Sequence, residues 1–346
     1  MGKRTKVMTI KKFWLLAILL VCLVGGGLWQ CSRPGNNDLG QPTISSVAFN
    51  KINQPIQPIP MQVMPDRVKV QLGEMLFHDP QLSSDNTISC ASCHDLKQGG
   101  TDRLRVSIGV NGALGTINAP TVFNCRFNDS QFWDGRVETL EEQIDSPIQA
   151  RTEMASTWPE VIRKLRQSSE YSSRFKAVYD DGITQDNIKD AIATFERSLI
   201  TPNSRFDRFL NGDGNAITAE EKEGYRRFRT YGCVACHQGV NVGGNMFHDL
   251  GVFGDYFKDR GNITQADFGR YNVTGEERDR YVFKVPSLRN VVLTAPYFHD
   301  GSATTLKEAV QTMGKYQLGR ELSDEDTTLI IRFLVTLTGK YRGEKL

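Results

Sequence analysis

The chain has 346 residues, of which 24% are charged and 39% are apolar, and these values exclude a disordered, collagen-like or multi-span membrane protein. The formal net charge is +2, but residues 1–12 hold five cations and no acid, so the remainder carries a formal −3. Because nucleic-acid binding depends on clustered cations, a body of this sign excludes that function.

An uncharged run of 17 residues, Phe13–Trp29, follows these cations. A secretory signal has an apolar segment of about 7–15 residues and a small-residue cleavage site, whereas a membrane span needs about 17–25 apolar residues. Residues 1–30 therefore favour a retained membrane anchor, with a cleaved signal or a lipid-modified Cys31 as alternatives. The positive flank predicts that the body lies outside the cytoplasm. Residues 31–66 are rich in Asn, Gln, Pro and Ser, a composition typical of a linker.

Four of the seven cysteines form two copies of one pattern, Cys90-Ala-Ser-Cys93-His94 and Cys233-Val-Ala-Cys236-His237. This C-x-x-C-H pattern is the attachment signature of c-type haem, in which both thiols form thioethers and the histidine binds the iron. A tetrahedral zinc site and a redox dithiol are the alternatives. Two copies in an exported chain favour two covalently bound haem c groups.

The remaining cysteines and histidines give weaker signals. Cys125 is predicted to be a small buried hydrophobe. His78 is predicted to be a structural, hydrogen-bonded histidine, and His299 suits a propionate, a backbone group or a metal equally well. His248 has no spacing argument behind it. Met313 is a thioether on an apolar helical face, which taken alone predicts a core residue.

Helical signals dominate the body. Apolar residues recur with helical spacing over 188–199. Capping signals at Thr218, Thr305 and Ser323 each open a helix, and Gly314 is predicted to stop the second of these. We therefore expect a mainly α fold of two cytochrome c-like haem domains packed against each other. Their boundary is expected near residues 201–215, which gives domains over 67–205 and 206–346.

The stretch from Leu72 to Arg136, which includes LGEMLFHDPQLSSDNTISCASCHDL and QFWDGR, resembles the bacterial di-haem cytochrome c peroxidases. The carboxyl half resembles them in FKVPSLRNVVLTAPYFHDGS (283–302) and in the segment around Met313. The resemblance extends from about residue 67 to the end. The same superfamily contains the methylamine-utilisation di-haem enzyme, which oxidises tryptophans in a partner protein.

The resemblance implies a role for individual residues. His94 would bind the iron of the low-potential, peroxidatic haem, and His237 with Met313 would bind the high-potential, electron-accepting haem. Glu153 and Gln143 would form the distal pair, with Glu153 as the proton shuttle, and Trp133 would lie between the haems. The inter-haem calcium site is implied at Asn118, Thr294 and Pro296, the last two through backbone carbonyls.

One position departs from the family pattern. Many members have a histidine after the S-x-G segment, and it blocks the peroxidatic iron until the other haem is reduced. Here the segment is Ser107-Ile-Gly-Val110, and valine cannot bind iron. The tryptophan-oxidising relative also lacks this histidine, but it has a tyrosine at the position of Met313. We therefore expect an open first haem that needs no prior reduction of the second.

The leading interpretation is a periplasmic, membrane-anchored peroxidase that reduces hydrogen peroxide to water with electrons from a small cytochrome c or cupredoxin. One alternative is a di-haem oxidase that modifies Trp or Tyr residues of a partner protein. The other is a plain electron-transfer cytochrome. Homodimers are common in the family, but nothing in this sequence marks an interface.

Overall fold

The computed structural model describes residues 54–61 and 65–346, so the predicted anchor lies outside the described residues. Within the described ranges, none of the helices combines the length and apolar character that a membrane crossing needs. The described residues belong to one compact unit. Helices predominate in it, which confirms the prediction of a mainly α fold.

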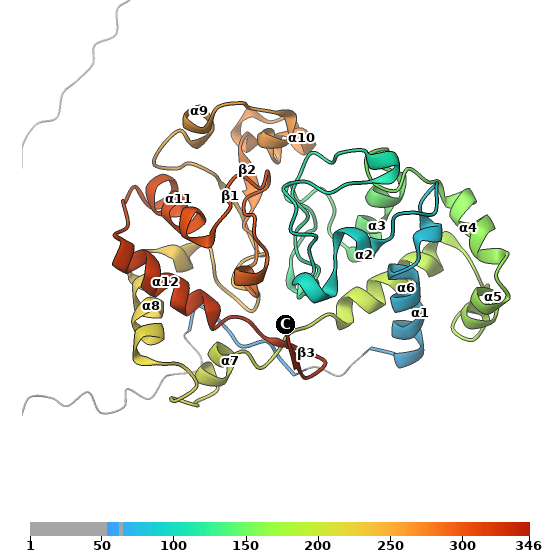
Figure 1. Cartoon of the computed structure of the whole chain (residues 1–346), viewed down its shortest axis with the longest axis horizontal. Helices are drawn as coiled ribbons and strands as arrows, with labels where there is room; N and C mark the ends of the chain where they lie inside the picture. The colour runs from blue at the N-terminus through green and yellow to red at the C-terminus, as the bar shows by residue number, and fades with distance from the viewer. Residues whose placement is uncertain (1–53, 62–64) are drawn as a thin grey trace, which may run out of the picture. The chain divides into compact units, whose positions relative to one another are not determined.

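The helices form two groups along the chain, which Figure 1 shows on opposite sides of the body. The amino-terminal group is α1 (Arg67–Phe77), α2 (Cys90–Cys93), α3 (Leu140–Gln149), α4 (Trp158–Arg166), α5 (Ser169–Lys176) and α6 (Gln185–Ser198). The carboxyl-terminal group is α7 (Arg205–Leu210), α8 (Ala219–Thr230), α9 (Tyr256–Arg260), α10 (Tyr271–Thr274), α11 (Leu306–Leu318) and α12 (Asp324–Val335).

Strands are short in the described part of the chain. In the carboxyl-terminal group, β1 (Phe247–Asp249) pairs antiparallel with β2 (Val282–Lys284), and His248 lies opposite Phe283. At the end of the chain, β3 (Lys340–Tyr341) and β4 (Glu344–Lys345) form a hairpin. Tyr341 of this hairpin packs on Phe123, with their ring centroids 5.2 Å apart, so the tail returns to the amino-terminal group.

Separate hydrophobic cores lie under the two helix groups. One core is built from residues between Leu72 and Ala193, and a second from residues between Phe206 and Leu337 together with Ile56. In the second core Phe206 and Phe333 meet edge to face with their ring centroids 5.0 Å apart. The predicted division into domains over 67–205 and 206–346 stays a prediction, and the change from one core to the other falls between Ala193 and Phe206.

The linker predicted over residues 31–66 stays a prediction, but its described stretch before α1 packs on the carboxyl-terminal group. Ile56 is fully buried in the second core, and Ile59 is buried too. The backbone of Gln57 donates a hydrogen bond to Gly239 O, and its carbonyl accepts one from the buried Arg289 guanidinium. Two isoleucines among polar residues therefore anchor this stretch on the carboxyl-terminal group, which its composition alone did not indicate.

The predicted helix starts are confirmed, but one predicted stop is wrong. The side chains of Thr218, Thr305 and Ser323 each accept a hydrogen bond from the first turn of the helix that follows. Helix α11 continues through Gly314 and ends at Gly319, whose φ of 59° is left-handed. Gly314 instead allows close packing, because a β-carbon there would lie 2.7 Å from Leu322 Cγ.

Candidate haem sites and their surroundings

The second C-x-x-C-H motif follows the end of α8 as a short 3₁₀ turn. The backbone of His237 donates to Cys233 O at 2.9 Å, which holds the pentapeptide in a tight loop. His237 Nδ1 lies 3.3 Å from Val242 O, so the neutral ring can donate there and leave Nε2 free. Burial lowers the pKa of His237 to about 4. A neutral imidazole with a free Nε2 is the form that binds a metal.

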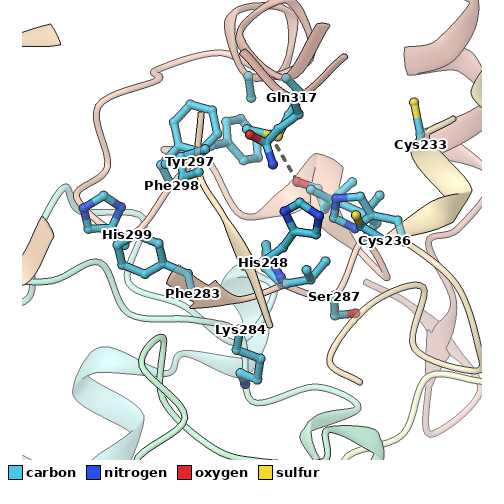
Figure 2. Close-up of a pocket in the computed structure, with 18 of the residues that line it drawn as sticks. Cys233, Cys236, His248, Phe283, Lys284, Ser287, Tyr297, Phe298, His299 and Gln317 are labelled. Atoms are coloured by element: carbon cyan, nitrogen blue, oxygen red, sulfur yellow. Dashed lines mark hydrogen bonds between the residues drawn. The ribbon is translucent and has the colours of Figure 1, made fainter. Parts of the chain in front are cut away.

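His237 lines a cavity of about 400 Å³. Figure 2 shows part of the lining of this cavity, including Cys233 and Cys236. Its lining is mainly apolar and includes Cys233, Cys236 and Met313. Helix α11 contributes the face that the sequence predicted to be apolar, since Leu306, Ala309, Val310 and Met313 all line this space. The structure therefore brings Met313 and His237, which are far apart in the sequence, to one cavity.

The first C-x-x-C-H motif is helix α2, which begins after Ser89. The backbone of His94 donates to Cys90 O at 2.9 Å, and His94 Nδ1 lies 3.3 Å from Gly100 O. Burial lowers the pKa of His94, as it does for His237. The two motifs thus repeat one local geometry. Each orients its histidine through a backbone carbonyl five or six residues later and keeps both thiols unpaired.

Glu153 lies close to the first motif. The pKa of the Cys90 thiol is raised first by burial and then by nearby negative charges, among them Glu196 and Glu153. Both carboxyls are therefore close enough to influence the first motif electrostatically. Burial also raises the pKa of Glu153 itself, and the positive charge of Arg136 opposes that rise. A half-buried carboxyl whose pKa lies above its ordinary value is suited to general acid–base catalysis, in which it accepts a proton and returns it.

Val110 and Glu153 are joined through their main chains. Val110 is only 3% exposed, and its N–H donates to Glu153 O at 2.9 Å. Gly109 allows this approach, because a β-carbon there would lie 2.2 Å from Thr152 O. Val110, at the position that the resemblance assigns to the blocking histidine, is therefore a buried aliphatic residue whose main chain is bonded to that of the candidate acid. Gln143 lies half-buried on α3, and no hydrogen bond links its side chain to Glu153 within the described ranges.

Trp133 lies where the two halves meet. Its indole N–H donates to Asn118 O at 3.0 Å, and its carbonyl accepts from Lys284 N at 2.8 Å. Trp133 and Asn118 line the cavity in front of His237, as do Thr294 and Pro296. The three residues implied for calcium therefore line the same cavity as Trp133, and Asn118 bonds directly to its indole.

The histidines outside the motifs have identifiable environments. His78 Nδ1 lies 2.9 Å from Glu74 O at the end of α1, as expected for a structural histidine. The buried His299 ring stacks on Phe283 and places Nε2 2.7 Å from Asp267 Oδ1. His248 on β1 lines the cavity (Figure 2), a position that the sequence gave no means to predict.

Cys125 is buried in the first core, which confirms its predicted role as a small apolar residue. Lys284 was not singled out by the sequence, but it is buried and lines the same cavity as Trp133. Its neighbours come from distant parts of the chain, so only the folded structure could place it there.

These observations fit two haem groups. Each site offers two free thiols, a neutral histidine with one ring nitrogen free, and apolar surroundings. The cavity at the second site is lined by both His237 and Met313, and the thioether sulfur of Met313 is a donor that suits haem iron. The fold and these sites together define a di-haem cytochrome of the c type.

Comparison with known proteins identifies the family. A family model described as di-haem cytochrome c peroxidase matches residues 67–215. The chain is 52% identical to a cytochrome c peroxidase of Escherichia coli strain K12 over 84% of its own length, and it spans 62% of the length of that protein. It is 48% identical to a cytochrome c551 peroxidase of Nitrosomonas europaea, with 87% of this chain and 89% of the relative covered.

A solved structure agrees with this assignment. A MauG-like protein associated with microbial copper homeostasis superposes with a TM-score of 0.72 at 27% sequence identity, covering 86% of this chain and 95% of that protein. The chain belongs to the di-haem cytochrome c peroxidase family. Membership places it among the oxidoreductases that act on peroxide, and the family implies two haem c groups.

Proposed function

We propose that this chain reduces hydrogen peroxide to water at its first haem without prior reduction of its second haem. The observation that carries the proposal is Val110, a buried aliphatic residue at the position of the blocking histidine. The hydrogen bond from Val110 N to Glu153 O keeps this loop against the candidate acid. A valine offers no nitrogen to the iron, so peroxide has access in the resting state.

The haem held by Cys90, Cys93 and His94 would supply, when bound, an iron that binds peroxide and passes electrons to it. The contribution of the protein is to move a proton. The Glu153 carboxylate takes the proton from one peroxide oxygen and returns it to the other, which then leaves as water. Gln143, on α3, is proposed to orient the peroxide. General acid–base catalysis of this kind contributes typically about 10²–10⁴ in rate.

The second site is proposed to store electrons. His237 and Met313 would bind its iron, and methionine ligation raises the potential of a haem. Trp133 is proposed to carry electrons between the sites, because it lines the second cavity while its indole bonds to Asn118 of the amino-terminal half. The surroundings of Asn118, Thr294 and Pro296 are proposed to bind one calcium ion.

The setting of the enzyme follows from the same reasoning. Electrons are proposed to come from a small periplasmic cytochrome c or cupredoxin. The apolar run before residue 30 is proposed to hold the enzyme at the inner membrane, with the catalytic body in the periplasm.

Steady-state peroxide turnover with a reduced donor cytochrome, measured with and without prior reduction of the enzyme, tests the proposal. Equal initial rates are expected, together with a high-spin signal from the first haem in electron paramagnetic resonance of the all-ferric protein. A lag that pre-reduction removes, or a first haem that is wholly low-spin with two histidine ligands, would refute it. Slow peroxide turnover with oxidation of a partner protein would favour the modifying oxidase.

A further inference from the structure

Lys284 is a buried cation whose ammonium group has no hydrogen-bond or ion-pair partner in the part of the chain that the structure describes. It is 8% exposed, and among the described residues neither a hydrogen bond nor an ion pair reaches its Nζ. Burial lowers its pKa to about 8, so a large fraction of the side chain remains charged at neutral pH. A buried charge of this kind is costly unless an opposite charge or hydrogen-bond acceptors compensate it.

The neighbouring side chains do not supply that compensation. The two groups whose charges act on Lys284 are Cys125 and Asp134. Burial raises the pKa of the Cys125 thiol, which keeps it neutral. Asp134 is already paired with Arg136, 3.1 Å away. The ammonium group of Lys284 is therefore free to bind an anion other than the neighbouring side chains.

The position of Lys284 points to the amino-terminal site. Its backbone N–H donates to Trp133 O, which ties β2 to the amino-terminal half. Cys125 and Asp134 both belong to that half as well. Figure 2 shows the Lys284 side chain directed away from Cys236 and His248 of the second site.

The cavity that Lys284 lines reaches towards the first motif. Its lining includes Thr101, Pro120 and Thr121 of the amino-terminal half, and Pro120 lies close enough to His94 for its carbonyl to act on that ring. The anions that belong in such a space are the two propionate carboxylates that every haem carries. An ammonium group is a compact cation that suits a carboxylate.

We propose that Lys284, from the carboxyl-terminal half, binds a propionate of the haem held by His94 and thereby raises the reduction potential of that haem. The inference rests on the proposed function only in requiring both haems to bind. A nearby positive charge stabilises the reduced iron relative to the oxidised iron. Because the site is buried, solvent and salt screen this effect little.

Replacement of the charge tests the proposal in the haem-loaded enzyme. Lys284→Met removes the charge at similar length, Lys284→Arg keeps it, and Lys97→Met removes an equal but exposed charge close to the first motif. In spectropotentiometric titration at a fixed potential, the ratio of reduced to oxidised first haem should be about tenfold lower in Lys284→Met than in the wild type. For one electron this ratio corresponds to a reduction potential lowered by about 59 mV. The Arg and Lys97 variants and the second haem should stay close to wild type.

Three results would overturn the proposal: an unchanged first haem in Lys284→Met, a shift confined to the second haem, or an equal shift in Lys97→Met. If the Met variant loses haem, Lys284→Gln is titrated in its place, and the haem content of each variant is measured as the pyridine haemochrome. Peroxide turnover by the wild type is measured separately, because it tests the proposed function and not the role of Lys284. Normal turnover with unshifted potentials would reject the role of Lys284 and leave the proposed function standing.

Discussion

The two haem-binding motifs share one local structure and differ in what faces it. In both, a histidine follows two free cysteines and directs Nδ1 towards a backbone carbonyl 3.3 Å away. The second motif faces a cavity whose lining includes the thioether of Met313. The first lies near Val110, which cannot bind iron, and Glu153, which can carry a proton.

The pentapeptide therefore determines where a haem is attached, whereas residues distant in the sequence determine whether its iron has a second protein ligand. An iron with ligands on both sides is suited to exchanging electrons, whereas an iron with one open side is suited to binding a substrate. The variants below are ordered by the size of the expected effect, and each alters the contrast between the two sites.

Removal of the carboxylate at the first site should have the largest effect. Glu153→Gln keeps the shape of the side chain but cannot accept a proton, so kcat/KM for peroxide should fall by about 10²–10⁴. Stopped-flow and steady-state kinetics with a reduced donor measure the loss. Glu138→Gln, which alters an exposed glutamate just before α3, is the matched control and should retain full activity.

The pH profile sharpens this first test. Because burial raises the pKa of Glu153, the acidic limb of kcat/KM should lie above the pH range of an ordinary glutamate. Activity should therefore fall as the pH drops through this raised pKa, since the protonated carboxyl cannot accept the peroxide proton. The limb should disappear in Glu153→Gln. An unchanged limb in that variant would assign it to another group.

Addition of a ligand to the first site should convert it into a closed site. Val110→His places an imidazole at the position that the family resemblance assigns to the blocking histidine. Initial activity of the all-ferric variant should fall about tenfold or more, and pre-reduction should restore part of it. Electron paramagnetic resonance should show the first haem changing from high-spin to low-spin.

Packing must be separated from ligation in this variant. Val110 is buried, and a larger side chain there costs about 1–3 kcal/mol in stability. Val110→Ile adds volume without a nitrogen, so it should lose some stability yet remain active without pre-reduction. Equal inactivation of the Ile and His variants would mean that loop packing, and not an open iron, explains the activity.

Loss of the thioether at the second site should make that site less able to hold electrons. Met313→Leu should abolish the low-spin signal of the second haem and lower its potential by tenths of a volt, within the range of about 0.8 V that axial ligands span. Val310→Ile, on the same cavity-facing side of α11, tests packing without removing sulfur. An unchanged spectrum in Met313→Leu would make Met313 an ordinary core residue.

The features that the sequence predicted are those set by residues close together in the chain. The two haem motifs are pentapeptides, and the helix starts at Thr218, Thr305 and Ser323 depend on contacts within one turn. Each of these local signals is complete in a few residues. Their positions in the structure therefore follow the sequence directly.

The features that the sequence missed depend on partners far along the chain. Ile56 is buried by residues beyond 205, and Gly314 is required by contact with Leu322, so neither environment is visible in a local pattern. Lys284 is unusual only because the fold buries it where residues 54–61 and 65–346 give its ammonium group no partner. The role proposed for Glu153 came from family resemblance, since an acid close after Arg151 is ordinarily a solvated surface residue.

The smallest expected effect concerns the stability of the first site and not its catalysis. Glu196 on α6 is buried, its Oε2 is without a hydrogen-bond partner among the described residues, and burial raises its pKa to about 8. The Glu196 carboxyl therefore stays protonated in the folded protein at pH values above 4.5, the ordinary pKa at which it loses its proton in the unfolded chain. Stability should be greatest below pH 4.5 on this account and should decrease as the pH rises to about 8.

Glu196→Gln removes this titration while preserving the shape of the side chain. The variant should flatten that part of the pH dependence, so its free energy of unfolding should fall less between pH 5 and pH 8 than that of the wild type. Thermal or denaturant unfolding of the haem-loaded protein at pH 5 and pH 8 measures the difference. A variant as pH-dependent as the wild type would show that Glu196 is already ionised and compensated. In that case buried carboxyls near the first motif would be ionised in the folded protein. The pH dependence of unfolding would then have to be measured for a Glu153→Gln variant as well.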